Sequence, residues 1–273
     1  MSEPVVADLH IHTTVSDGIL EITEIPELAK TQGLSAVGIT DHDRIHPWFD
    51  DPVAEESGVL LIRGIELRVE REDGTRFDIL GYAIEETEAL TDLLEQIQEA
   101  RIERGKEMIA LLEDRLDIVL DVSVGPGFGR PHMARAVAEH PETDYTELDV
   151  FRELIGNGKP CYVSRWVPAI DHGIEILEEA AAVLSVAHPL RYDDVDGAIS
   201  LAKRVGGIER WYPYEQEVSL DPIDVAIEEE DLIPTGGSDA HDTEIGTTGV
   251  PAEAFAHLID SGNIERASVR SRR

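Results

Sequence analysis

The sequence is poor in cysteine, in long apolar runs and in the features of a secretory leader. Cys161 is the only cysteine, so no intrachain disulfide can form and a reducing compartment is expected. No run of about 18 apolar residues is present, which predicts no transmembrane helix. The first residues, MSEPVVADLH, lack the basic and apolar regions of a signal peptide. These absences predict a cytoplasmic protein with no membrane partner.

Positive charge is also scarce, because 23 Lys and Arg face 57 Asp and Glu, for a net charge of −34. The acidic residues are spread along the whole chain, which predicts a halophilic protein. In molar salt the Debye length is only about 3 Å, so self-repulsion is screened. An ordinary acidic enzyme is the alternative. In either case no broad basic surface is available for long duplex nucleic acid, so a phosphorylated partner must be small or be bound only locally.

Short apolar runs alternate with amphipathic patterns, which predicts an α/β fold with a parallel sheet or barrel. The Asp73-Gly74 pair between two alternating segments predicts a hairpin turn. A charged stretch at 86–116 predicts a long helix or a helix pair. Residues 266–273 are expected to form a frayed tail. We expect a barrel from 1–85 and 166–273, interrupted by a mostly helical inserted subdomain at 86–165. Strands are expected within 5–11, 35–40, 59–69, 70–82, 181–188, 207–212 and 231–241.

Polar residues collect where these apolar runs end. His10 and His12 share one face of the first strand, opposite Leu9 and Ile11, because side chains alternate along a strand. The carboxyl ends of parallel strands converge on one face of a barrel, so residues far apart in sequence are expected to meet there. A structural network of buried His–carboxylate pairs is the alternative, at a cost of several kcal/mol per ion. The other run ends carry Asp41, His42, Asp43, Glu66, His188, Asp239 and His241, whereas His46, His140, His172 and His257 are assigned no role.

The mixture of histidine and carboxylate favours Mn²⁺, Zn²⁺ or Fe²⁺ over a Ca²⁺ cage of oxygens. With Asp17 in the Gly-containing turn after the first strand, the candidate ligands exceed the four that one tetrahedral ion takes. Two or three ions are therefore expected, with Glu66 as a bridging ligand. Clustered ions about 3.5–4 Å apart are typical of hydrolases that displace a group at phosphorus.

Five motifs resemble those of the PHP (polymerase and histidinol phosphatase) superfamily. They are DLHIHTTVSDG (8–18), TDHD (40–43), GIE (64–66), AHP (187–189) and GSDAH (237–241). The resemblance implies a distorted (β/α)7 TIM-like barrel with two or three divalent metal ions at the carboxyl ends of its strands. The implied ligands are His10, His12, Asp17, His42, Glu66, His188, Asp239 and His241.

GRPHMARAV (129–137), NGKPCYV (157–163) and AHPLRY (187–192) give a narrower resemblance. This narrower resemblance is to the small PHP phosphoesterases that include nucleoside 3',5'-bisphosphate phosphatases and the 5'-to-3' exoribonuclease RNase AM. It implies that Arg130 and Lys159 bind the substrate phosphate, and His132 beside them is a further candidate. The sequence departs from the family at FDILGY, where Asp78 stands in place of a histidine that can bind metal. Aspartate can bind the same ion, so Asp78 is a ninth candidate ligand. The sequence also reads His188-Pro189-Leu190 where HPG is usual, which affects the local turn.

The expected reaction is hydrolysis of phosphomonoesters by a hydroxide that bridges two ions. Its substrates would be 3',5'-nucleoside bisphosphates or short 5'-phosphorylated oligonucleotides. His241, Asp43 and His132 are the candidate acids for the leaving group, and the sequence does not choose among them. Histidinol phosphate phosphatase activity and a non-catalytic metal-binding PHP module are the alternatives.

Overall fold

The computed structural model of the protein describes residues 4–264. The chain forms two compact units, one from Met1–Thr91 with Pro168–Arg273 and the other from Asp92–Val167. The boundary between them falls inside one long helix, α2 (Glu88–Leu116). The tail expected at 266–273 lies outside the described residues. Within the described residues, no helix is both long and apolar enough to span a membrane.

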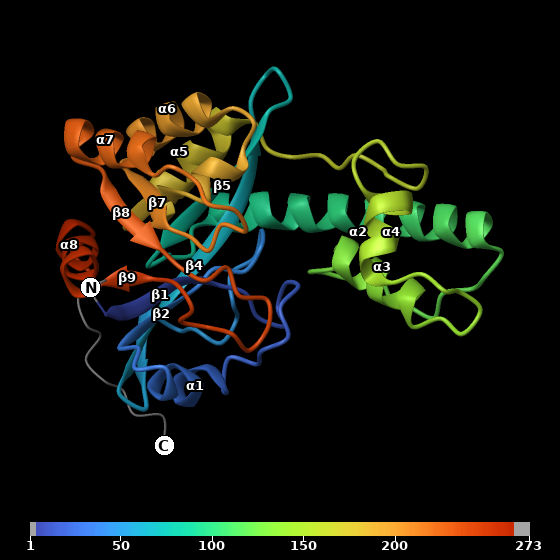
Figure 1. The fold of residues 1–273 in the computed structure, drawn as a ribbon, viewed down its shortest axis with the longest axis horizontal. Coiled ribbons are helices and arrows are strands. Elements are labelled where there is room, and N and C mark those ends of the chain that lie inside the picture. Colours follow the sequence, from blue (N-terminus) through green and yellow to red (C-terminus); the bar gives the residue numbers. More distant parts are fainter. Residues whose placement is uncertain (1–3, 265–273) are drawn as a thin grey trace. The chain divides into compact units, whose positions relative to one another are not determined.

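A nearly closed barrel of seven strands forms the first unit (Figure 1). Neighbouring strands run parallel, except that β5 is antiparallel to both β4 and β6. A parallel bridge from Ile11 to Ala240 brings the ends of β1 and β8 together, and the His12 N–H donates to the Ala240 carbonyl at 2.9 Å. The distorted (β/α)7 barrel expected from the sequence is thereby confirmed. In hydrogen-bonded order the strands are β8 (Ile233–Gly236), β7 (Gly207–Trp211), β6 (Val183–Val186), β5 (Arg76–Tyr82), β4 (Val59–Glu70), β2 (Ala36–Ile39) and β1 (Val5–Ile11).

Helices cover the outside of this sheet, as Figure 1 shows. For example, α6 packs on β6 and β7, and α8 packs on β8 and β1. Two further strands pair at the margins: β3 (Val53–Glu56) with β4, and β9 (Val250–Pro251) with β1. The covering helices are α1 (Ile25–Thr31), α5 (Ile170–Ala180), α6 (Val195–Val205), α7 (Asp221–Glu230) and α8 (Ala252–Ser261).

The predicted hairpin joins β4 to β5. Gly74 has φ +85° in its turn, where the Arg71 N–H donates to the Thr75 carbonyl at 2.8 Å. Because β4 continues to Glu70 along this hairpin, Glu66 lies inside a strand and not at its end as the sequence suggested. The buried Leu67 and Val69 extend the strand past Glu66. Since β5 is antiparallel, its first residues return to the same end of the barrel.

The second unit is mostly helical. It contains most of α2, which is one helix and not a pair, together with α3 (Arg130–Ala138), α4 (Glu147–Val150) and a π-helical turn at Phe151–Ile155. Its apolar core includes Met108, Met133 and the buried Cys161.

Candidate metal centre

The nine side chains predicted as ligands come together at the carboxyl end of the parallel strands of the barrel. Their donor atoms form three overlapping groups, and within each group these atoms lie within 4.8 Å of one another. Asp239 joins them, with Oδ1 3.1 Å from His12 Nε2 and 3.4 Å from His10 Nε2. The groups are His12, Asp17, His42 and His241; His10, His12 and Glu66; and Glu66, Asp78 and His188.

Closure of the barrel depends on a buried carboxylate that the sequence interpretation missed. Asp8 is fully buried, and its Oδ1 accepts the N–H groups of His10 and Ser238 at 3.3 and 2.9 Å. Its Oδ2 accepts the Ser238 hydroxyl at 2.6 Å and the Gly246 N–H at 2.7 Å. Burial raises the pKa of Asp8 to about 6, although these four hydrogen bonds oppose that rise. A Cβ at Gly237 would lie 2.3 Å from the His10 nitrogen, so only glycine fits there.

Asp41 positions the turn that carries Asp17. Its carboxylate accepts the Thr13 N–H at 2.8 Å, the Thr13 hydroxyl at 2.7 Å and the Ser16 hydroxyl at 2.6 Å. These three hydrogen bonds hold the loop between β1 and Asp17.

Glu209 on β7 supports two candidate ligands and was also missed. It is fully buried, its Oε1 lies 3.1 Å from His10 Nδ1, and its Oε2 accepts the His188 N–H at 2.6 Å. A carboxylate on the far nitrogen fixes the tautomer of a ligand histidine, so that Nε2 is directed at the ion. The signal in the sequence was a glutamate inside the buried run GIERW, and Asp8 in VVADLHI carries the same signal.

Tyr212 and Arg191 form the outer side of the centre. The Tyr212 hydroxyl donates to Asp239 Oδ2 at 2.8 Å, and Arg191 Nη1 donates to the Tyr212 hydroxyl at 2.8 Å. Arg191 is the last residue of a 3₁₀ turn at Pro189–Arg191, which begins in the unusual His-Pro-Leu tripeptide. His188, just before this turn, adopts φ +32°. The turn therefore forms without the usual glycine.

The side chains of the centre shift one another's pKa values. Burial raises the pKa of Asp17, but the neighbouring His42, His241 and His12 outweigh it, so the net pKa lies below the usual range. The pKa values of Glu66 and Asp239 are lowered in the same way, against burial. Burial, with His241 and His42 nearby, lowers the pKa of His12. Burial lowers the pKa values of His10 and His241, but nearby carboxylates outweigh it, so both lie above the usual range. Because metal binding requires neutral histidine, an ion would have to displace protons from these two imidazoles.

Buried donor atoms at the centre also lack hydrogen-bond partners. His10 Nε2 and His12 Nδ1 are buried and make no hydrogen bond. The buried oxygens Asp17 Oδ1 and Glu66 Oε2 lie 3.3 Å from His241 Nε2 and 2.7 Å from His42 Nδ1, respectively. The two nitrogens are costly unless something else binds them, because a buried polar group without a partner loses its hydration. The residues present therefore fit divalent ions bound by mixed nitrogen and oxygen ligands.

The remaining candidates of the first unit are Asp43 and Asp78. Asp43 is buried, and its Oδ1 accepts the Arg68 N–H at 3.2 Å. Asp78 directs both carboxylate oxygens at the Arg68 guanidinium. Both aspartates thus lie at the centre next to the same arginine.

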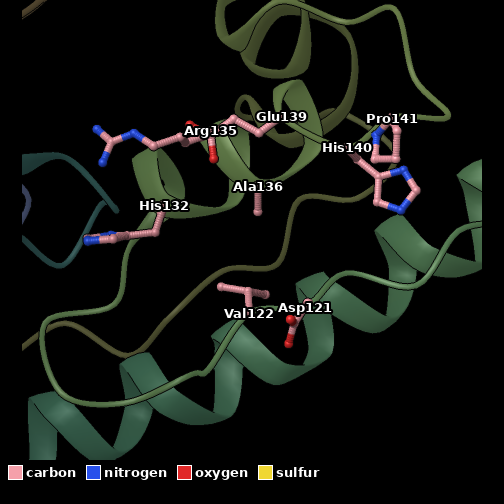
Figure 2. Close-up of a pocket in the computed structure, with 8 residues that line it drawn as sticks. All are labelled: Asp121, Val122, His132, Arg135, Ala136, Glu139, His140 and Pro141. Atoms are coloured by element: carbon pink, nitrogen blue, oxygen red, sulfur yellow. The ribbon is translucent and has the colours of Figure 1, made fainter.

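Arg130, His132 and Lys159 belong to the second unit. Arg130 Nη1 donates to Asn157 Oδ1 at 3.3 Å, two residues before the exposed Lys159. His132 Nδ1 accepts the N–H of Gly129, the residue that precedes α3, at 3.2 Å. His132 also lines a cavity of about 390 Å³ within this unit. Figure 2 shows Val122 opposite Ala136 across it.

Comparisons with known proteins agree with this geometry. A family model described as PHP domain matches residues 8–202. A 5'-3' exoribonuclease of Haemophilus influenzae is 31% identical over 196 residues, which cover 68% of this chain and 69% of that protein. A 3',5'-nucleoside bisphosphate phosphatase of Chromobacterium violaceum is 30% identical over 194 residues, which cover 68% of this chain and 67% of that one.

A solved structure from Bifidobacterium adolescentis, assigned by inference as a metal-dependent phosphoesterase, matches with a TM-score of 0.75 and 25% identity. The match covers 96% of this chain and 98% of that one. The resemblance read from the motifs is thereby confirmed, and the chain belongs to the PHP domain family.

Proposed function

We propose that this chain is a metal-dependent phosphoesterase that acts on 3',5'-nucleoside bisphosphates or on short 5'-phosphorylated oligonucleotides. The observation that carries the proposal is the chain of overlapping ligand groups, in which His12 links the first to the second and Glu66 links the second to the third. Two relatives at about 30% identity are named as a 5'-3' exoribonuclease and a 3',5'-nucleoside bisphosphate phosphatase, which supports this substrate class. The net charge of −34 fits a small phosphorylated substrate better than a long duplex.

Divalent ions at this centre, for which Mn²⁺, Zn²⁺ and Fe²⁺ are the candidates, would supply positive charge opposite the phosphoryl oxygens and lower the pKa of water. Glu209 keeps His10 Nε2 directed at the centre, since it engages the opposite ring nitrogen. Arg191 lies beside Asp239, and 54% of its side chain is exposed, so it can bind a phosphoryl oxygen from the solvent side.

Arg130, Lys159 and His132 remain proposed phosphate-binding residues. Guanidinium suits two-point contact with phosphate, and ammonium acts as a point charge. His241, Asp43 and His132 remain the proposed proton donors for the leaving group. Of the two in the first unit, His241 is the more accessible, with 38% of its side chain exposed. A halophilic and cytoplasmic protein remains a prediction of the composition.

Substrate turnover tests the proposal. The protein is purified in roughly 2 M KCl, which screens its charge. After loading with Mn²⁺ it is assayed with 3',5'-bisphosphoadenosine, AMP, a 5'-phosphorylated tetraribonucleotide and histidinol phosphate. We expect hydrolysis of the bisphosphate or the oligonucleotide, and loss of that activity in His12→Gln. His257→Gln, which alters an exposed histidine on α8, is the matched control and should keep full activity.

Hydrolysis of histidinol phosphate alone would favour the alternative phosphatase. Bound metal without hydrolysis of any of the four compounds would favour a non-catalytic module.

A further inference from the structure

Arg68 and Asp78 form an ion pair inside the candidate metal centre. They lie directly opposite each other on the antiparallel strands β4 and β5. Arg68 Nε donates to Asp78 Oδ1 at 2.7 Å, and Nη2 donates to Oδ2 at 2.6 Å. Two parallel charge-assisted bonds of this kind are the strongest contact that arginine makes with a carboxylate. Only 2% of the Asp78 side chain is exposed, so water does not compete for its oxygens.

The same carboxylate belongs to the third ligand group. His188 Nε2 lies 3.7 Å from Asp78 Oδ2 and 3.0 Å from Glu66 Oε1. An ion bound between these three side chains would have to share an Asp78 oxygen with Arg68 or displace Arg68 from it. It would then lie beside a guanidinium that remains protonated at every pH at which the protein is folded. Repulsion between the two cations in a buried site opposes binding there.

The other two groups differ in this respect. His10 Nε2 and His12 Nδ1 are buried without hydrogen bonds. The carboxylates of Asp17 and Glu66 lie against histidines and not against an arginine, at 3.3 Å from His241 Nε2 and 2.7 Å from His42 Nδ1, respectively. Both oxygens of Asp78, in contrast, accept hydrogen bonds from Arg68. A histidine can give up its proton when an ion binds, whereas the Arg68 guanidinium cannot, so an ion at Asp78 would always face a second cation.

Neighbouring acids hold Arg68 in place. Asp78, and to a smaller extent Glu66 and Asp43, raise the pKa of Arg68 against the effect of burial. Asp43 also accepts the Arg68 N–H, which anchors the backbone at this point of β4. Glu66 and Arg68 lie two residues apart and therefore face the same side of the strand.

We propose that the Arg68 guanidinium takes the place of a third divalent ion, so that the centre binds two ions and Arg68 itself binds a phosphoryl oxygen of the substrate. The pair with Asp78 uses two of the five N–H groups of arginine. With 35% of its side chain exposed, Arg68 can offer the others to a ligand. Asp78 then positions Arg68 and is not a metal ligand. The phosphate contact rests on the proposed function, whereas the number of ions does not.

Counting bound metal tests the proposal without any substrate. The protein is saturated with Mn²⁺ in roughly 2 M KCl, which weakens binding to surface carboxylates. It is then desalted and analysed by mass spectrometry of the elements. We expect two ions per chain in the wild type and three in Arg68→Ser/Asp78→His, where a ligand histidine replaces the ion pair. Arg68→Ala, which leaves Asp78 without its partner, should also bind three.

Arg76→Ala is the matched control. It removes an arginine from the same hairpin, where Arg76 pairs across the strands with Glu70 at 2.6 Å, and it should leave two ions. Any wild-type count other than two, or no third ion in the double variant, overturns the proposal. The double variant keeps this test valid if Arg68→Ala fails to fold.

Arg68→Lys tests the phosphate contact. Lysine keeps the charge but cannot make the two-point contact. We expect the variant to bind two metal ions, as the wild type does. Its affinity for inorganic phosphate at the active site should fall roughly tenfold, because a charge-assisted hydrogen bond is lost. An unchanged phosphate affinity would overturn this part. If the wild type binds two metal ions and the double variant binds three, but the wild type hydrolyses no substrate, the proposed phosphoesterase activity is wrong and the metal assignment still holds.

Discussion

At the scale of single residues, the acids behind the candidate ligands are as deeply buried as the ligands themselves. Asp8 and Glu209 are fully buried, like His10 and His12. The carboxylate of each acid is stabilised by hydrogen bonds from candidate ligands or from the backbone and side chains that support them. A buried charge is tolerated only when it is paired or hydrogen-bonded, so these acids and the ligands they support form one interdependent unit.

We predict that Glu209→Gln weakens Mn²⁺ binding about 10- to 100-fold. Glutamine keeps the shape, but its amide nitrogen must face either His10 Nδ1 or the His188 N–H, so one of the two contacts is lost. Titration of the metal-free protein against a competing chelator measures the affinity. Glu217→Gln, on an exposed loop residue, should leave the affinity unchanged. Equal affinities for the two variants would contradict the role given to Glu209.

His46 predicts a pH dependence of stability. Burial lowers its pKa, while Asp41 and Glu21 partly oppose this, and its Nδ1 accepts the Trp48 N–H at 3.1 Å. Since the folded pKa lies below the unfolded value of about 6.5, the stabilisation is complete above that pH and is lost as the pH falls below it. Urea unfolding of the metal-free protein should show wild type and His46→Asn converging between pH 7.5 and pH 5. A constant difference across that range would show that His46 does not titrate as described.

At the scale of elements, the β4–β5 hairpin connects the fold to the site. Its register sets Arg68 opposite Asp78 and Glu66 opposite Leu80. A slip of one residue would move every side chain of β5 to the other face. The turn at Gly74 therefore determines which residue meets Arg68.

We predict that Gly74→Ala lowers the free energy of unfolding by about 1–2 kcal/mol, because φ near +85° is unfavourable for a residue with a Cβ. No atom lies within 4 Å of the added Cβ, so the cost is conformational. Gly125→Ala is the control, since its Cβ also meets open space and its φ is not positive. It should change stability by less than about 0.5 kcal/mol. Denaturant unfolding measures both, and equal effects would exclude a special turn at Gly74.

At the scale of the whole molecule, the net charge of −34 dominates. Self-repulsion among so many carboxylates destabilises the compact state in dilute buffer. The ion pairs at the metal centre are buried, so salt screens them less than it screens the charges on the surface. Salt should therefore change the free energy of unfolding mainly through the surface carboxylates.

We predict that the free energy of unfolding rises steadily from about 0.1 M to about 2 M KCl, as the Debye length falls from about 10 Å to a few ångströms. Replacing the exposed Glu107, Glu178 and Glu229 by lysine should flatten this slope, and replacing them by glutamine should flatten it less. Thermal unfolding across the salt series measures the effect. A slope that is the same in all three proteins would remove the electrostatic explanation and with it the halophilic interpretation.

The sequence by itself determined the features that depend on near neighbours. The alternation of His10 and His12 with Leu9 and Ile11, and the Asp73-Gly74 turn, follow from side-chain periodicity and backbone preference over a few residues. The motifs identified the family for the same reason, since each is a short contiguous stretch of residues. Only the tertiary structure decided which partner each buried charge meets. Glu209 supports His10 from 199 residues away, and Asp78 pairs with Arg68 because β5 runs antiparallel beside β4. Pairing of buried charges depends on which strands are neighbours and in which register, and that is a property of the closed barrel.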